Sequence, residues 1–158
     1  YFIYCSEMWN QLDALTGLLN QNSYLNQTGG VRCRGGILVV FDVDDFKQIN
    51  DRYGHIQGDL CLAGIAECIK KSYANFGYCY RIGGDEFCVL LKNADKEDWC
   101  KQEFLHRLEE KRRKITFLPT VSYGSASFSC GDIVAVKDKA DRDMYQYKYE
   151  WKNRNGMV

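Results

Sequence analysis

The sequence predicts an α+β domain in which helices pack on a mostly antiparallel, ferredoxin-like sheet of about five strands. Residues 37–41 form a continuous apolar run rich in β-branched side chains, which is typical of a strand buried on both faces. A helical pattern follows this strand, and then two strand-like runs enclose a Gly-Gly pair. Such a central hairpin interrupts the alternation of strands and helices that a doubly wound parallel fold requires, and it favours the antiparallel arrangement.

The other elements follow from the spacing of apolar residues along the chain. Residues up to about Leu19 are expected to be helical, because Leu12, Leu15 and Leu19 recur at helical spacing. The glycine-rich stretch Thr28–Gly36 predicts a loop. Further helices are expected over 45–53, 58–71, 95–114 and 137–153, and further strands over 76–82, 86–92 and 116–128.

The balance of charge limits the kinds of partner that this domain can bind. Its 158 residues suit one compact domain, and 21 Lys and Arg side chains against 21 Asp and Glu side chains give a formal net charge of +0. This balance excludes a nucleic-acid binder that works by bulk positive charge. No run approaches the roughly 20 apolar residues of a membrane span, so no membrane contact is expected for this domain.

The eight cysteines are scattered along the chain rather than clustered. An even number could form the disulfide framework of a secreted protein, but such frameworks space their cysteines in compact patterns. There is no Cys-x-x-Cys pair and there are only two histidines, which argues against a zinc site. The cysteines are therefore interpreted as small buried apolar residues in a reducing cytoplasm.

Two groups of acidic residues stand next to predicted strands. Asp42 follows the buried strand, and Asp85 lies in the turn of the predicted hairpin. If the strands pair, the two carboxylates approach each other and repel unless a cation lies between them. Oxygen ligands favour Mg²⁺ or Mn²⁺, and two carboxylates that bridge two such ions serve in-line phosphoryl transfer. The alternative interpretation is that each group is a solvated turn.

The hairpin turn carries two glycines before its acids. Gly83 and Gly84 allow the backbone to turn with φ > 0 and allow a ligand to approach closely. A plain Gly-Gly hairpin would explain the pair equally well. Two glycines followed by two acids and then Phe87 are rarer in a plain turn, which favours a functional role.

The residues after Asp42 suit a phosphate group and a purine base. The predicted helix starts directly after the strand, so its first N–H groups can bind an anion, and Lys47 adds positive charge there. Asn50 and Asp59 carry polar groups suited to a purine edge, since a carboxylate accepts hydrogen bonds from guanine and would repel the acceptor N1 of adenine. On their own, both would be interpreted as surface residues of helices.

Taken in order, these segments resemble the GGDEF domain of diguanylate cyclases, which join two GTP molecules into cyclic di-GMP. The signature at 83–87 is intact and follows Arg81. The other matching segments lie at 13–20, 42–59, 122–126 and 140–148. The resemblance implies a nucleotidyl-cyclase palm as a catalytic domain over residues 13–158, with residues 1–12 as the end of a linker or signalling helix from an upstream region.

The resemblance also implies roles for individual residues. Asp42 and Asp85 would hold two Mg²⁺ (or Mn²⁺) ions per active site, with the backbone carbonyl of Val43 as a further ligand. Glu86 would complete the catalytic set, either as a ligand or as a support for deprotonation of the attacking hydroxyl. The residues implied to bind substrate are Asn50 and Asp59 for guanine, His55 near the nucleotide, and Asp45, Phe46, Lys47, Lys148 and Lys152 for the phosphates.

The implied reaction is an attack of the 3′-hydroxyl of one GTP on the α-phosphorus of another, with pyrophosphate as the leaving group. Metal ions would polarise the phosphate and lower the pKa of the attacking hydroxyl. Because each domain would bind one GTP, two domains must face each other, so activity should depend on a homodimer. The implied location is the bacterial cytoplasm, with any membrane anchor of the full-length protein lying upstream.

A few positions depart from the family pattern. Gln21 stands where Arg is usual, Trp151 replaces a usual Gly, and Lys152 keeps the charge of a usual Arg without its bidentate fork. Residues 74–77 lack the Arg-x-x-Asp of the family's inhibitory product site, so no feedback inhibition through that site is expected. The alternatives are a catalytically silent GGDEF domain that binds GTP or a partner, and a cyclase with another nucleotide choice, which Asp59 argues against.

Overall fold

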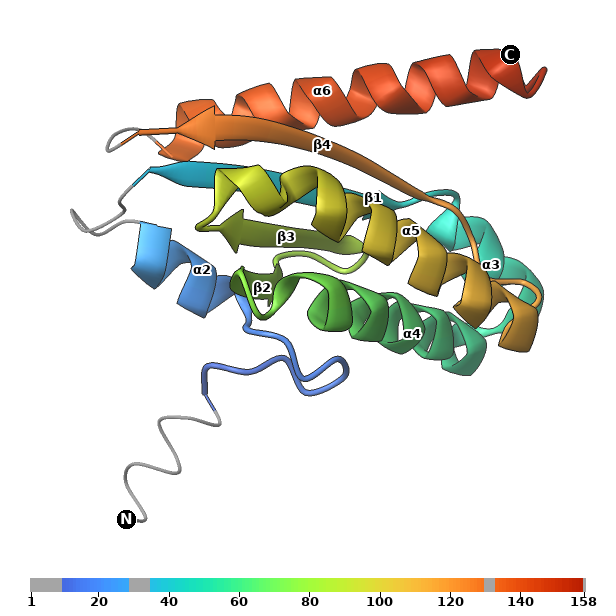
Figure 1. Ribbon diagram of the computed structural model, residues 1–158. Helices are drawn as coiled ribbons and strands as arrows, with labels where there is room; N and C mark the ends of the chain where they lie inside the picture. Colours follow the sequence, from blue (N-terminus) through green and yellow to red (C-terminus); the bar gives the residue numbers. More distant parts are fainter. Residues whose placement is uncertain (1–9, 29–34, 130–132, 158) are drawn as a thin grey trace.

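The computed structural model describes residues 10–28, 35–129 and 133–157, and it confirms the predicted α+β class (Figure 1). The elements in chain order are α2 (Gln21–Thr28), β1 (Gly36–Val43), α3 (Phe46–Tyr53), α4 (His55–Tyr73), β2 (Gly77–Arg81), β3 (Glu86–Leu91), the 3₁₀ helix η1 (Ala94–Lys96), α5 (Glu97–Lys114), β4 (Val121–Phe128) and α6 (Ile133–Arg154). None of the helices in these ranges is long and apolar enough to span a membrane.

The four strands form one antiparallel sheet in the order β2-β3-β1-β4. The strand β1 is central, because it pairs antiparallel with β3 on one side and with β4 on the other. About five strands were expected, and the described part of the chain has four. Beside the edge strand β2, Leu19 adds a single bridge to Tyr80, held by two backbone hydrogen bonds of 3.1 and 2.8 Å.

Helices cover both faces of the sheet, which explains why β1 is apolar at successive positions. Val39 and Phe41 point into a core that they share with α4 and α5. Leu38 and Val40 point into a second core that they share with α2 and α6. Figure 1 shows α6 running along β4, with α4 and α5 side by side on the other face. A strand buried on both sides has no solvent-facing positions, so the alternation of polar and apolar residues disappears.

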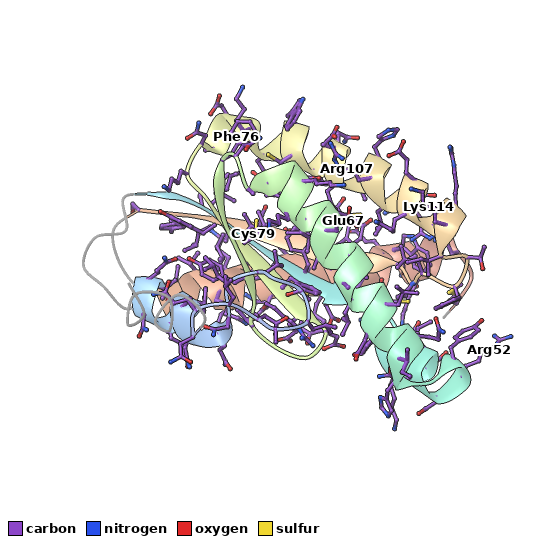
Figure 2. All side chains as sticks on the ribbon, turned by 90° about the horizontal axis from the view of Figure 1, so that it is seen from below. Arg52, Glu67, Phe76, Cys79, Arg107 and Lys114 are labelled. Carbon is purple, nitrogen blue, oxygen red and sulfur yellow. The ribbon has the colours of Figure 1, made fainter. Side chains whose placement is uncertain are left out.

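The two long helices of the first core are joined at their surface by charged side chains. Figure 2 shows α4 and α5 side by side, with Glu67 on α4 and Arg107 and Lys114 on α5. Glu67 accepts hydrogen bonds from Lys71, at 2.6 Å, and from Lys111 of α5. These two ammonium groups lower the pKa of Glu67 to about 2. Because Glu67 is largely exposed, its ion pairs with Lys71 and Lys111 contribute little to stability. The pair with Lys111 serves mainly to align α4 with α5.

The helix expected to end near Leu19 is absent from its described part, and this prediction is wrong. Residues 10–20 form turns instead, and Leu12 bridges back to Leu19. Asp13 accepts hydrogen bonds from the backbone N–H of Thr16 at 2.9 Å and from its hydroxyl at 2.7 Å, which closes a local turn. Gly17, with φ of 71°, then takes a left-handed conformation that ends any helix.

The helix that does form in this region, α2, was not expected. The side chain of Asn20 accepts a hydrogen bond of 2.9 Å from the backbone N–H of Ser23, which is the interaction of an N-cap residue. Tyr24 packs from this helix into the second core, where its ring meets that of Tyr80 edge to face at 5.5 Å. The spacing of the three leucines therefore predicted the wrong helix, whereas the polar Asn20 marks the start of the helix that forms.

The other boundaries differ from the expected ones by up to five residues. The strand expected from 116 starts at Val121, because the chain first makes a turn before Pro119, which has no N–H to donate to a sheet. Helices α4 and α6 begin earlier than expected, at His55 and Ile133. The predicted linker helix over 1–12 and the predicted loop over 28–36 lie mostly outside the described residues.

The described cysteines behave as small buried apolar residues, as expected. All five are buried and have free thiols, and they are Cys61, Cys68, Cys79, Cys88 and Cys100. Burial raises the pKa of Cys79 to about 12 and also raises that of Cys88. Their thiols are therefore protonated near neutral pH and chemically inert. Cys5, Cys33 and Cys130 lie outside the described residues.

Candidate active site

The acidic residues singled out in the sequence meet where β1 ends. Asp42 stands opposite Glu86 in the ladder between β1 and β3, so their side chains share the face of the sheet that α6 covers. The next N–H along the chain, that of Val43, donates to the backbone carbonyl of Asp85 at 3.1 Å. The hairpin turn is thereby tied to the end of β1. The structure thus gathers Asp42, Val43, Asp85 and Glu86, and the pairing of the strands brings Asp42 and Asp85 to the same sheet edge, as expected.

The electrostatics of this group favour a bound cation. Burial raises the pKa of Asp42, and the like charges of Asp85 and Asp44 raise it further against the opposing effect of Lys148. Burial also raises the pKa of Glu86, to which the charges of Asp42 and Asp85 add. Burial is the larger cause, and the smaller contributions of the neighbouring acids mean that the carboxylates also repel one another. A cation between them would relieve that repulsion.

The available ligands fit Mg²⁺ or Mn²⁺ better than zinc. The candidate donors are the carboxylates of Asp42 and Asp85 and the carbonyl of Val43, which are all hard oxygen atoms. Among the described residues, no group of three or more His, Cys, Asp or Glu side chains is placed to hold a metal ion. Mg²⁺ is commonly bound by one or two carboxylates, with water and substrate phosphates completing its coordination.

The glycines of the hairpin turn have a different role from the one expected. Neither Gly83 nor Gly84 has the positive φ that the sequence suggested, so that prediction is wrong. A Cβ on Gly83 would lie 3.1 Å from Oε2 of Glu86, whereas a Cβ on Gly84 would meet nothing within 4 Å. Gly83 therefore leaves room for the Glu86 side chain. The open space at Gly84 is consistent with close approach of a ligand.

Arg81 ties the hairpin turn to the start of the domain. Its guanidinium donates to the carbonyl of Gly84 at 2.8 and 3.2 Å and forms an ion pair with Asp13 at 3.1 Å. Although burial alone would raise it, the pKa of Asp13 is lowered by the hydrogen bonds from Thr16 and by Arg81. Arg81 thus holds the adjacent turn and ties it to Asp13, which lies 68 residues away in the chain.

The chain turns sharply after Asp44 and presents a helix N-terminus beside the acids. Asp45 has φ of 53° and ψ of 32°, a left-handed conformation that aspartate tolerates better than most residues. Phe46 packs against the first core and anchors the start of α3, while Lys47 is exposed. The first N–H groups of any α-helix lack intrahelical acceptors, so this end of α3 suits an anion.

The packing of α3 against α4 brings Asn50 against Gly58, the residue before Asp59. The backbone turns between the two helices at Gly54, where φ is 89°. A Cβ on Gly58 would lie 1.9 Å from Oδ1 of Asn50, so the absence of a side chain at this position lets the Asn50 amide lie against α4. Asp59, which follows Gly58 in the chain, is exposed. His55 is also exposed, at the start of α4.

The last helix contributes a lysine to the same site. Lys148 of α6 places its Nζ 3.1 Å from Oδ2 of Asp42 and 3.1 Å from Oδ1 of Asp44. Lys152 follows four residues later and is half-buried. Burial would lower the pKa of Lys148, but the two carboxylates outweigh it and raise that pKa, so the ammonium stays charged. The two lysines, separated by about one turn, lie on one side of the helix.

The sequence interpretation missed the role of the Asp44 side chain and its partners on β4. Asp44 accepts hydrogen bonds from the hydroxyl of Ser122 at 2.7 Å and from that of Thr120 at 2.8 Å. A signal was present, because Thr120 and Ser122 alternate with the apolar Val121. A buried hydroxyl needs a hydrogen-bond partner, so this pattern indicated a polar acceptor nearby.

The fold and the site define a class of protein: an antiparallel α+β domain that gathers acidic groups and an anion-binding helix end at one end of its sheet. The family model described as "Diguanylate cyclase, GGDEF domain" matches residues 10–154. The chain therefore belongs to the GGDEF domain family.

Known relatives support this assignment. Diguanylate cyclase DgcZ of Escherichia coli is 29% identical over 165 residues, which cover 98% of this chain and 55% of the relative. Diguanylate cyclase A of Treponema denticola is 30% identical over 144 residues, which cover 87% of this chain and 39% of the relative. The chain thus spans about half or less of the length of these relatives.

Solved structures share the fold. The GGDEF domain of DgcB from Caulobacter crescentus, crystallised in complex with c-di-GMP, superposes with a TM-score of 0.75 at 26% identity, covering 89% of this chain and 91% of that one. The diguanylate cyclase SiaD from Pseudomonas aeruginosa, in complex with its activator SiaC, superposes with a TM-score of 0.73 at 25% identity. The match covers 94% of this chain and 63% of that one.

Proposed function

We propose that this domain is a diguanylate cyclase, which condenses two GTP molecules into cyclic di-GMP and two pyrophosphates. The observation that carries the proposal is the meeting of Asp42 with Asp85 and Glu86 at the end of β1, directly before the N-terminus of α3. Phosphoryl transfer from a nucleoside triphosphate requires a site for metal ions next to a site for the phosphate groups. The relatives named as diguanylate cyclases support the same activity.

The nucleotide would lie across α3, with its two ends held by different groups. The β- and γ-phosphates would bind the N–H groups of Asp45 and Phe46 and the ammonium groups of Lys47, Lys148 and Lys152. The guanine would lie toward α4, where Asn50 and Asp59 present an amide and a carboxylate to its edge and His55 stands nearby. Asp59 would accept hydrogen bonds from guanine N–H groups, which adenine cannot offer in the same place.

In the proposed reaction, the 3′-oxygen of one GTP forms a bond to the α-phosphorus of the other, and the bond from that phosphorus to pyrophosphate breaks. The 3′-hydroxyl gives its proton to solvent water during the attack, pyrophosphate leaves, and two such steps close the ring. Two Mg²⁺ (or Mn²⁺) ions held by Asp42, Asp85 and the Val43 carbonyl would polarise the phosphate and acidify the hydroxyl. Glu86, opposite Asp42, adds to the negative potential that holds the ions.

One domain supplies only half of this arrangement. Each copy would bind one GTP, so catalysis would need a homodimer of GGDEF domains with their sites opposed. The upstream region, reached through residues 1–12, would set how often two copies meet and so carry the regulatory input. We place the domain in the bacterial cytoplasm, where GTP is available. Holding two nucleotides face to face can supply several kcal/mol of the barrier reduction.

Product inhibition through residues 74–77 is not part of the proposal. Ala74 ends α4, and Gly77 begins β2. A Cβ on Gly77 would lie 2.1 Å from the backbone carbonyl oxygen of Leu90, so this backbone accepts no side chain at that position. The acidic member of the family's inhibitory motif therefore has no place here.

The direct test is turnover of GTP. The domain is incubated at high concentration with GTP and Mg²⁺, both alone and fused to a segment that forces dimerisation, and the products are separated by anion-exchange chromatography. We expect cyclic di-GMP and pyrophosphate, with a higher rate from the fused dimer. GTP binding without product from the forced dimer would instead support the catalytically silent GTP-binding module.

The contact between Gly58 and Asn50 gives a prediction about nucleotide binding. Gly58→Ala is expected to push the Asn50 amide aside and to weaken binding of GTP about tenfold, because a guanine edge loses a correctly placed partner. The free energy of unfolding is expected to change by less than about 1 kcal/mol, because the methyl group meets the movable end of the Asn50 side chain and alanine favours the helix. Titration calorimetry with 3′-deoxy-GTP, which lacks the attacking hydroxyl, measures the first effect, and thermal unfolding measures the second.

Gly64→Ala is the matched control, since it lies in the same helix and is also buried. A Cβ there would lie 3.4 Å or more from its neighbours, which are flexible side chains. Alanine favours helix over glycine by about 1 kcal/mol, so this variant should be as stable as the wild type or more so and should bind the nucleotide normally. Equal nucleotide affinity in the two variants would contradict the proposed role of Asn50.

A further inference from the structure

Asp44 lies in an enclosed polar site between β1, β4 and α6. Its side chain is only 11% exposed. Both carboxylate oxygens are occupied, because Oδ1 accepts from Ser122 at 2.7 Å and Oδ2 accepts from Thr120 at 2.8 Å. Lys148 lies 3.1 Å from the same Oδ1. The backbone N–H of Asp44 also donates to the Thr120 carbonyl at 2.9 Å, so both its main chain and its side chain are fixed to the start of β4.

The neighbouring Asp42 is held far less tightly. Its side chain is 20% exposed. Within the described ranges, Lys148 is its only hydrogen-bond donor. Two aspartates on the same face of the chain thus differ in their surroundings. Asp44 accepts from two hydroxyl groups and contacts Lys148, whereas Asp42 contacts Lys148 alone and can release it when another cation binds.

We propose that Asp44 is a positioning residue that holds Lys148 at the place where the triphosphate binds. This role rests on the proposed function, in which Asp42 takes a cation. Once it does, Asp42 no longer holds the lysine, and Asp44 is the carboxylate that remains. A lysine has a flexible four-carbon stem, so an ammonium must be fixed by a partner if it is to meet a phosphate without a large loss of entropy.

The two hydroxyls on β4 make Asp44 suitable for this task. Thr120 and Ser122 donate to different oxygens of the carboxylate, which sets its orientation as well as its position. Its Oδ1 therefore lies where it meets the Lys148 ammonium, at 3.1 Å, while the packing of α6 on β4 positions only the backbone of that lysine. A different explanation is that Asp44 only ties the end of β1 to β4 and stabilises the fold. The two explanations differ in whether the effect of Asp44 depends on Lys148.

The test is a double-mutant cycle measured by nucleotide binding. Affinities for 3′-deoxy-GTP and 3′-deoxy-GMP in Mg²⁺ are compared for the wild type, Asp44→Asn, Lys148→Met and the double variant. We expect each single variant to bind the triphosphate about tenfold more weakly and the monophosphate within about twofold of the wild type. The double variant should bind the triphosphate no more weakly than Lys148→Met alone, because the two residues act as one unit.

Several outcomes would overturn the proposal. If Asp44→Asn weakens triphosphate binding as much with Lys148→Met present as without it, or weakens both nucleotides equally, then Asp44 acts through the fold. A wild-type domain that binds neither nucleotide would overturn the proposed function, and this role with it. If Asp44→Asn does not fold, Thr120→Val replaces it, and a several-fold weakening that disappears without Lys148 is expected. The exposed Asp95→Asn serves as the unchanged control.

Discussion

Replacing Asp85 with asparagine is expected to lower the rate of cyclic di-GMP formation by at least about a hundredfold. Only two of the proposed metal ligands are carboxylates, and a neutral amide in place of one removes half of the charge that these ligands supply. The fold should survive, since the link between the turn and β1 uses the backbone carbonyl of Asp85, which the substitution keeps. Initial rates are measured by anion-exchange separation of the nucleotides, and the fold is checked by circular dichroism.

The companion variant Asp42→Asn should lose activity to the same extent, with a larger effect on its surroundings because it also loses the ion pair with Lys148. Asp95→Asn is the matched control, as its side chain is 76% exposed and lies at η1, away from the site. It should keep the wild-type rate. A folded Asp85→Asn variant with a rate within about fivefold of the wild type would contradict the assignment of the cation site.

The parts of this domain that the sequence predicted well follow from local composition or from the pairing of strands that local composition identifies. The strand β1 is buried on both faces, so its composition alone identified it. The juxtaposition of Asp42 with Asp85 and Glu86 followed once β1 and the hairpin were assumed to pair, because antiparallel pairing brings the end of one strand beside the start of the next.

The parts that could not be predicted depend on contacts between distant segments. The turn over residues 10–20 is held by Arg81, 68 residues from Asp13, and no local pattern reports that ion pair. The enclosure of Asp44 depends on Thr120 and Ser122, which are 76 and 78 residues away. The contacts of Asp44 can be predicted only when the register between β1 and β4 is known.

Gly83 shows a further limit of interpretation by residue type. Glycine suggested a positive φ, but Gly83 has none, and a Cβ there would instead crowd the Glu86 side chain at 3.1 Å. A glycine can be needed for its backbone conformation or for close approach of another group, and the residue type alone does not distinguish the two. Gly124 belongs to the second kind as well, and it gives the strongest prediction about stability.

Gly124→Ala is expected to destabilise the domain by about 3 kcal/mol, which corresponds to a fall in melting temperature of roughly 6–12 °C. A Cβ on Gly124 would lie 2.2 Å from the backbone nitrogen of Met144 and 2.3 Å from the carbonyl oxygen of Ala140. Both atoms belong to the backbone of α6, so no side-chain rotation can relieve the collision. The helix must move away from β4 and open the second core, in which Ala140 and Met144 are buried.

Ser125→Ala on the same strand separates this effect from a general sensitivity of β4. The backbone N–H of Ser125 donates to Asp143 at 2.9 Å, and alanine keeps that hydrogen bond. Its stability should stay within about 0.5 kcal/mol of the wild type. Because a displaced α6 also carries Lys148 away from Asp42 and Asp44, the Gly124→Ala variant should bind 3′-deoxy-GTP more weakly even at temperatures where it is folded. A loss of less than about 1 kcal/mol in chemical unfolding would show that α6 can shift on β4 at little cost, contrary to this expectation.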